Sequence, residues 1–199
     1  MMKKDEPAAP RRPRADAERN RMRLLAAAKA AFAEKGSNAS LDEIARAARV
    51  GAGTLYRHFP TRDALVEAVY RNETEQLLAA ADRLMSTHSP VAALREWLLL
   101  FVDFIVTKHG MYELLDAITG GTSDLYSETT PKLKQAVASL IERAESSEEV
   151  RLNIDPLALL RACAGVAHTS AGPEGERDAK QLVDILISGI RTEPGIRGS

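Results

Sequence analysis

The sequence has a single cysteine, few aromatic residues and no long hydrophobic run. Because Cys163 has no partner cysteine in the chain, an internal disulfide is excluded, and such usage is typical of a reducing compartment. The longest uninterrupted apolar run is 97–102, far short of the ~20 residues that a membrane-spanning helix needs. A charged start followed by an apolar stretch and a small-residue cleavage site is also missing. We therefore expect a soluble, cytoplasmic protein.

Signals for metals and phosphate-binding loops are equally scarce. The four histidines are scattered, and none has a cysteine or histidine at metal-ligand spacing. Gly120 and Gly121 lack the flanking pattern and the lysine of a phosphate-binding loop. No metal and no cofactor are predicted.

The composition favours helices over strands. Aromatic residues make up 5% of the chain, alanine and leucine dominate the apolar set, and no strand-like alternation extends beyond a few residues. The 199 residues, 45% hydrophobic and 28% charged, have an ordinary globular composition for one domain or two small ones. We expect an all-α fold.

The charge is unevenly distributed along the chain. Residues 1–71 contain 15 Lys and Arg against 9 Asp and Glu, whereas residues 72–199 contain 12 against 19. A basic front on an acidic remainder suggests that only the front meets a polyanion. Basic N-terminal segments also occur without any specific partner, so the sequence motifs are needed to distinguish these two interpretations.

The chain divides into an arm, a small head and a larger second part. Residues 1–15 are predicted to be a disordered basic arm, because their prolines lie among lysines and arginines with little to bury. Asp16 is then a plausible N-cap for a helix that ends at Lys35, before Gly36. The buried positions expected on this helix are Met22, Leu25, Ala28 and Phe32. The head is assigned to residues 16–71 and the second part to residues 72–199.

Two short helices in the head have the spacing of a helix-turn-helix. Ser40 and Glu43 form a capping-box pattern, in which each side chain reaches the other residue's backbone N–H. A tight turn is predicted at 49–51, and a second short helix at 52–58 buries Leu55. Two short helices joined by a glycine-containing turn of three or four residues are typical of this motif.

The remainder is predicted to be a helical bundle, giving about nine helices in all. Long helices are expected at 62–85 and around 94–105, the latter apolar almost all round. Helices are also predicted up to residue 118 and at 132–145, 156–169 and 176–191. The stretch between 120 and 131 is predicted to be irregular, because it contains two glycines and ends in Thr-Pro.

The outer side of the 52–58 helix has unusual residues for a solvated surface. Thr54, Tyr56, Arg57 and His58 are polar, while glycine and alanine at 51–53 let the backbone approach another surface closely. Hydroxyl, imidazole and guanidinium groups all suit phosphate oxygens. An ordinary solvated face with one satisfied aromatic side chain is the alternative.

The stretch from Ile44-Ala45 through Val50-Gly51-Ala52-Gly53-Thr54-Leu55-Tyr56-Arg57-His58-Phe59-Pro60 resembles the DNA-binding signature of the TetR family of bacterial transcriptional regulators. The resemblance covers about residues 16–70. It implies backbone contacts by Thr54, Tyr56 and His58, and base-edge positions at Ala52 and Gly53. Arg62 replaces the usual lysine at the start of the next helix and is expected to hold phosphate. The full set of expected DNA-binding residues is Ser40, Asp42, Ala52, Gly53, Thr54, Tyr56, Arg57, His58 and Arg62.

Beyond residue 70 the resemblance is architectural, and it implies ligand binding and dimerisation. The expected dimer stripes are Leu157, Leu160, Ala164 and Ala167, and Leu182, Ile185, Leu186 and Gly189, although both sets would also suit an intramolecular core. The expected pocket residues are Trp97, Phe101, Phe104, His109, Met111, Tyr112, Leu115, Tyr126, Cys163 and His168. Each apolar member of this pocket set would also suit plain core.

These observations predict a DNA-binding homodimer that represses transcription and releases a near-palindromic operator when a small, largely apolar effector binds. A ligand-independent or architectural DNA-binding protein, or an activator, is the alternative. An enzyme is not expected. Cys163 and His168 would project about 140° apart on a helix of 3.6 residues per turn, which suits no nucleophile and base.

Overall fold

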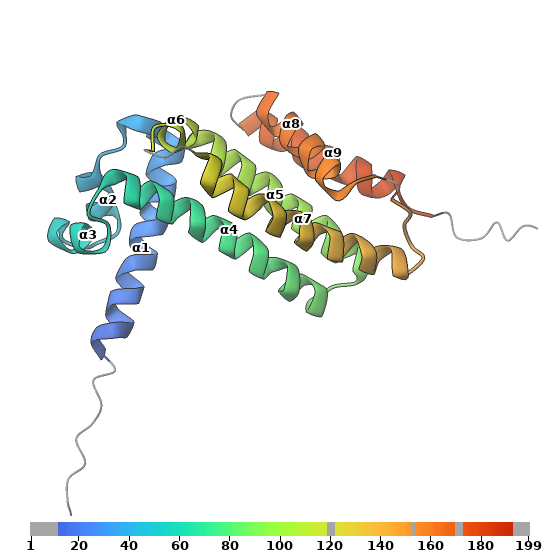
Figure 1. Cartoon of the computed structure of the whole chain (residues 1–199), viewed down its shortest axis with the longest axis horizontal. Coiled ribbons are helices and arrows are strands. Elements are labelled where there is room, and N and C mark those ends of the chain that lie inside the picture. Colours follow the sequence, from blue (N-terminus) through green and yellow to red (C-terminus); the bar gives the residue numbers. More distant parts are fainter. Residues whose placement is uncertain (1–11, 119–121, 153, 170–172, 193–199) are drawn as a thin grey trace, which may run out of the picture. The chain divides into compact units, whose positions relative to one another are not determined.

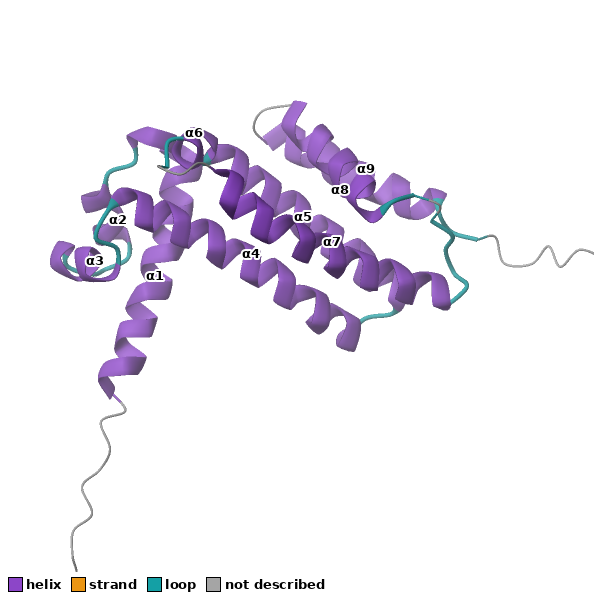
Figure 2. Ribbon diagram, viewed as in Figure 1, coloured by secondary structure: helices purple, strands orange, loops and turns teal. Residues whose placement is uncertain are grey.

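The computed structural model describes residues 12–118, 122–152, 154–169 and 173–192 (Figure 1). Within these ranges the chain forms nine α-helices and one short 3-10 helix, and no strand longer than an isolated bridge between Val150 and Arg191 (Figure 2). The predicted all-α fold is confirmed. None of the helices in the described ranges is long and apolar enough to cross a membrane.

The chain separates into two compact units, residues 1–69 and 70–199. The first contains α1 (Arg12–Lys35), η1 (Gly36–Asn38), α2 (Leu41–Ala47) and α3 (Ala52–His58). Helix α4 (Arg62–Thr87) begins in the first unit and continues into the second. The core of the first unit is formed by Leu24, Leu25, Ala28, Phe32, Ile44, Ala45, Leu55, Phe59, Leu65 and Val66.

Helix α1 begins earlier than the sequence predicts. It starts at Arg12, so residues 12–15 of the predicted arm are helical; the rest of the arm, 1–11, lies outside the described residues. Pro13 is tolerated there because the first-turn N–H groups have no intrahelical acceptor. Met22 is 41% exposed, and Leu24 takes the buried position instead. The predicted end at Lys35 is correct, with Gly36 at φ +53°.

The two ends of helix α2 differ in how their backbone groups are satisfied. Ser40 is its N-cap, but the Ser40 side chain makes no capping hydrogen bond, so that half of the predicted capping box is wrong. At the other end the N–H of Arg49 donates to Arg46 O and that of Val50 to Ala45 O, both at 3.0 Å. This is a Schellman motif, and Arg49 has the left-handed φ of +55° that it requires.

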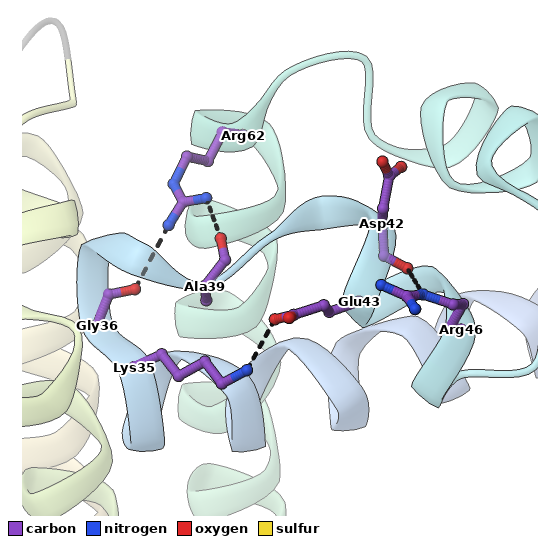
Figure 3. A network of polar contacts seen from close by, with 7 residues as sticks. All are labelled: Lys35, Gly36, Ala39, Asp42, Glu43, Arg46 and Arg62. Carbon is purple, nitrogen blue, oxygen red and sulfur yellow. Dashed lines mark hydrogen bonds and ion pairs between the residues drawn. The ribbon is translucent and has the colours of Figure 1, made fainter.

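The Glu43 carboxylate binds Lys35 across the first unit (Figure 3). Lys35 Nζ lies 2.8 Å from Glu43 Oε2. This hydrogen bond, reinforced by charge attraction, lowers the pKa of Glu43 and raises the pKa of Lys35. The Ser40 backbone contributes further to the lowered Glu43 pKa. Both side chains are substantially exposed, so the pair orients α1 and α2 but contributes little stability.

Arg62, the first residue of α4, clamps the connection between α1 and α2. Its Nη1 donates to Ala39 O at 2.5 Å, and its Nη2 donates weakly to Gly36 O at 3.4 Å (Figure 3). The Nη2 group also donates to Ser37 O at 2.8 Å. The guanidinium carbon also lies 5.4 Å from the centre of the Phe32 ring. The guanidinium thus satisfies carbonyls of η1 and of Ala39, in the segment that joins α1 to α2.

The second unit is built around α5 (Pro90–Gly110). It also contains α6 (Tyr112–Asp116), α7 (Thr122–Ser146), α8 (Pro156–Thr169) and α9 (Pro173–Gly189). Helix α5 contacts α7, α8 and α9, and α8 lies beside α9 (Figure 1). The Trp97 indole N–H donates to Leu77 O at 2.9 Å, and the Trp97 ring stacks on Phe101.

The stretch between 120 and 131, predicted to be irregular, is helical from Thr122 onward and belongs to α7. The helix starts at Thr122 and runs through Pro131, although a proline inside a helix removes one backbone hydrogen bond. Its buried positions recur at helical spacing on both sides of the proline: Leu125, Thr129, Leu133, Val137, Leu140 and Ala144. Burial of this continuous face offsets the cost of the proline, which the local turn signals alone could not predict.

Arg62→Ala should destabilise the protein by about 2–3 kcal/mol, because it leaves three carbonyls without their charged donor. Arg62→Lys should recover only part of this loss, since an ammonium lacks the planar fork of a guanidinium. Urea unfolding followed by circular dichroism measures both variants. A wild-type midpoint for Arg62→Ala would contradict the clamp.

Candidate nucleic-acid interface and internal cavity

Helix α3 is attached through one side and open on the other. Leu55 and Phe59, one turn apart, are buried in the first unit. Tyr56 is 48% exposed, and Ala52, Gly53 and Arg57 are also exposed. The two remaining polar residues, Thr54 and His58, are half-buried at the edges of this face.

The glycines at the start of α3 are not required by the packing of the chain. A Cβ added at Gly51 or Gly53 would meet no atom within 4 Å, and neither residue has a positive φ. A glycine inside a helix costs about 1 kcal/mol relative to alanine. The structure therefore offers no internal reason for Gly53, whereas close approach by an external surface would supply one.

The other exposed residues near α3 retain groups for outside contacts. Arg57 Nε donates to Gly53 O at 3.1 Å, which holds the side chain along the helix. Ser40 and Asp42 are exposed at the start of α2. The Asp42 carbonyl accepts from Arg46 Nε at 3.4 Å, which leaves the carboxylate out of this contact (Figure 3).

Arg62 differs from the rest of the expected DNA-binding set. The sequence predicts that it holds phosphate, but in the structure it is half-buried and its guanidinium binds the chain's own carbonyls. This geometry gives Arg62 a structural role, and its phosphate contact stays a prediction. Arg62 and its acceptors are more than twenty positions apart, so no local pattern revealed the contact.

The second unit holds two adjoining cavities of about 310 and 320 Å³. The first is lined by Tyr70, Phe101, Phe104, Ile105, Lys108, Tyr126, Thr129, Thr130, Leu133, Leu157, Leu160, Arg161 and Ala164. The second is lined by Ile105, Lys108, His109, Tyr112, Tyr126, Ala164, Gly165 and His168. Volumes near 300 Å³ are at the small end of the range for small-molecule sites.

Tyr70 joins the first cavity to α4. Its hydroxyl lies 2.8 Å from Thr129 Oγ1, and its ring lies 5.9 Å from Phe104 and 5.8 Å from Tyr126, centre to centre. Burial raises the pKa of Tyr70. The wall of the first cavity thus includes a residue of α4.

The predicted pocket residues separate into two groups. Phe101, Phe104 and Tyr126 line the first cavity, and His109, Tyr112, Tyr126 and His168 line the second. The two histidines touch, with Nδ1 atoms 3.1 Å apart. Trp97, Met111, Leu115 and Cys163 line neither cavity and are buried in the core. Sequence reasoning missed Tyr70, Lys108 and Arg161, because no local pattern shows which side chains the packing of distant helices brings to a cavity.

The two predicted dimer stripes also differ. On α8, Leu160 and Ala167 are buried within the subunit, and Leu157, Leu160 and Ala164 line the first cavity. On α9, Ile185 is 61% exposed, Gly189 is exposed, and Leu182 and Leu186 are half-buried. Only α9 therefore presents a large apolar side chain of this set to the outside.

Two family models match this chain. The model described as bacterial regulatory proteins of the tetR family matches residues 24–69. The model for the C-terminal domain of SbtR-like transcriptional regulators matches residues 89–192, which is more than half of the chain. The matched ranges thus include the α2–α3 region and every residue that lines the two cavities except Tyr70.

Similar proteins and structures agree with these models. The TetR transcriptional regulator SCO0520 from Streptomyces coelicolor is 39% identical, with a TM-score of 0.80 over 87% of this chain and 99% of that one. A TetR regulatory protein from Mycobacterium vanbaalenii is 32% identical, with a TM-score of 0.71 over 90% and 99%. The regulator UidR of Escherichia coli K12 is 37% identical over 65 residues, 32% of this chain and 33% of that protein. The match to UidR thus spans about a third of its length.

The family models, the structural neighbours and the helix-turn-helix lead to one conclusion. Members of this family regulate transcription by binding DNA and are not enzymes, as the sequence predicted. The chain belongs to the TetR family of bacterial transcriptional regulators.

Proposed function

We propose that this regulator is a homodimeric repressor that releases a near-palindromic operator when a small molecule enters the cavity of its second unit. One observation carries the proposal: α4 begins in the helix-turn-helix unit, and its Tyr70 forms part of the cavity wall. A regulator of this kind acts on DNA in the cytoplasm.

The exposed face of α3 is the proposed reading surface. Because Leu55 and Phe59 hold its other side, this face can enter a major groove without unfolding. Thr54, Tyr56 and His58 would contact phosphate groups. Ala52 and Gly53 would lie against base edges, where a methyl group or bare backbone can pack on a thymine methyl.

Sequence preference is proposed to come from the remaining polar groups. Arg57 is exposed and can form a bidentate contact with guanine. Ser40 and Asp42 are exposed at the start of α2 and would lie near the same groove. Because Arg62 is bound to the chain, it is left out of this set.

Dimerisation is proposed to use the outer side of α9. Ile185 is exposed there between half-buried Leu182 and Leu186, and Gly189 lets another helix approach closely. Two recognition helices related by a twofold axis engage half-sites about 34–36 Å apart. The α8 residues of the predicted stripe would contribute less, since they already pack inside the subunit.

In the proposed response, the effector must bind more tightly to the conformation of the regulator that does not fit the operator. A molecule that displaced Tyr70 from Thr129 would act on α4, the helix that both units share. A coupling of roughly 1–3 kcal/mol would lower operator affinity about 5–150-fold.

The coupling is tested with two fluorescent probes of the same ring skeleton, 8-anilinonaphthalene-1-sulfonate and N-phenyl-1-naphthylamine. A probe that occupies the cavity should weaken binding to a selected duplex about 5–150-fold in an anisotropy titration. Ala164→Phe, which fills space shared by both cavities, should abolish probe binding and this effect. A probe that occupies the cavity without changing duplex affinity would contradict an effector response and favour the ligand-independent alternative.

Gly53→Ala should stabilise the protein by up to about 1 kcal/mol, because alanine is the better helix former and its Cβ meets no atom of the chain. The same methyl should weaken duplex binding at least about tenfold, since it pushes α3 away from the groove. Thermal unfolding and anisotropy measure the two effects. Unchanged DNA affinity would show that α3 does not approach the duplex at this point.

Ile185→Glu should convert the dimer to a monomer, because a carboxylate would be buried at the centre of the proposed interface. Leu100→Glu is the matched control, since Leu100 is an exposed leucine on α5. Sedimentation equilibrium gives the molecular mass. Two variants with the same dimer mass would place the interface elsewhere.

A further inference from the structure

Apart from tyrosines, the ionisable side chains that line the two cavities are all basic. Lys108 and Arg161 line the first cavity, Lys108 lines the second as well, and His109 and His168 complete the set. Among the residues that the structure describes, no aspartate or glutamate lines either cavity. This is the reverse of residues 72–199 as a whole, where 19 acidic residues face 12 Lys and Arg.

Lys108 lies between the cavities with its charge poorly satisfied. Its Nζ is 3.8 Å from the centre of the Tyr126 ring, and the structure gives it no ion pair within the described residues. Burial lowers the pKa of Lys108, because a half-buried ammonium loses water without gaining a carboxylate. An anion in the cavity would remove this cost.

Three cations elsewhere in the second unit have acidic partners. Lys180 binds Asp103 at 2.7 Å, Arg95 binds Asp184 at 2.7 Å, and Lys134 binds Asp155 at 3.0 Å. Arg161 is exposed where α8 borders the first cavity, and no ion pair is given for it among the described residues. Lys108 and Arg161 are thus two cations at the first cavity for which the described residues give no ion pair.

The rest of the first cavity is suited to an apolar body. Phe101, Phe104, Leu133 and Leu160 supply aromatic and branched surfaces, and the hydroxyls of Tyr70 and Thr129 bind each other. Such walls favour a ring or branched chain, while the two cations favour one oxyanion at its end.

We propose that the effector is a small anionic amphiphile, in which a carboxylate or another single oxyanion binds Lys108 and Arg161 and an apolar body fills the first cavity. This inference rests on the proposed effector function of the same cavity. The sequence predicts only a small, largely apolar effector, whereas the cavity favours one that also carries a negative charge. Neutral and cationic molecules are then not the preferred ligands.

The two probes separate the charge from the apolar body, because N-phenyl-1-naphthylamine lacks only the sulfonate of 8-anilinonaphthalene-1-sulfonate. Fluorescence titration of the full chain should show at least about tenfold tighter binding of the sulfonate, as a charge-assisted contact predicts. Equal or tighter binding of the uncharged probe would overturn the proposal.

Two variants test whether the sulfonate binds Lys108 and Arg161, and a third variant serves as the control. Lys108→Met and Arg161→Gln should each weaken sulfonate binding at least about tenfold and leave binding of the uncharged probe within about twofold. Arg83→Gln removes an exposed charge of α4 outside the cavity walls and should change neither. Lys108→Met should also keep or raise the melting temperature, because it removes a half-buried charge.

The failure of this inference is distinguishable from that of the effector function. If the uncharged probe binds as tightly as the sulfonate and still releases the duplex, the effector function stands and the anionic class is wrong. If the sulfonate binds through Lys108 without affecting the duplex, the anion site stands and the effector function is wrong. Unchanged sulfonate binding in both cavity variants would place that probe elsewhere and overturn the anion site.

Discussion

Burial of Leu55 and Phe59 is the interaction on which the rest of the account depends. Leu55 lies on a helix of seven residues, which is too short to be stable alone, and Phe59 is the C-cap of this helix, one turn further on. Their burial determines that Ala52, Gly53, Tyr56 and Arg57 face outward. The Schellman turn at Arg49 and the Arg62 clamp then fix the segments on either side, so the exposed face is presented by a supported helix.

The parts of the fold predicted correctly are those specified by local signals. The bounds of α3 follow from Gly51, Pro60 and the spacing of Leu55 and Phe59, and Gly36 ends α1 through its positive φ. The parts predicted wrongly are those decided by distant contacts. Pro131 lies inside α7 because a long buried face outweighs one lost hydrogen bond.

The candidate sites show the same division. The exposed residues of α3 could be read from helical spacing, but Arg62 could not be assigned, because its acceptors at 36–39 come from another part of the chain. The cavity was only partly predicted. Trp97 and Cys163 are as apolar as Phe104, and only the packing of α5 against α7 and α8 decides which side chains border a void. Lys108 was missed because a lysine on an apolar helix gives no local sign that it is half-buried.

The central claim is that the outer faces of two α3 helices, one from each subunit of a symmetric dimer, recognise the DNA duplex. Selection of randomised duplex DNA by the purified protein tests this claim most directly. The account predicts an enriched motif with twofold symmetry and half-site centres about one helical turn apart, or a multiple of it. Recovery of sequences without any common motif, or no retention of duplex at low ionic strength, would contradict it.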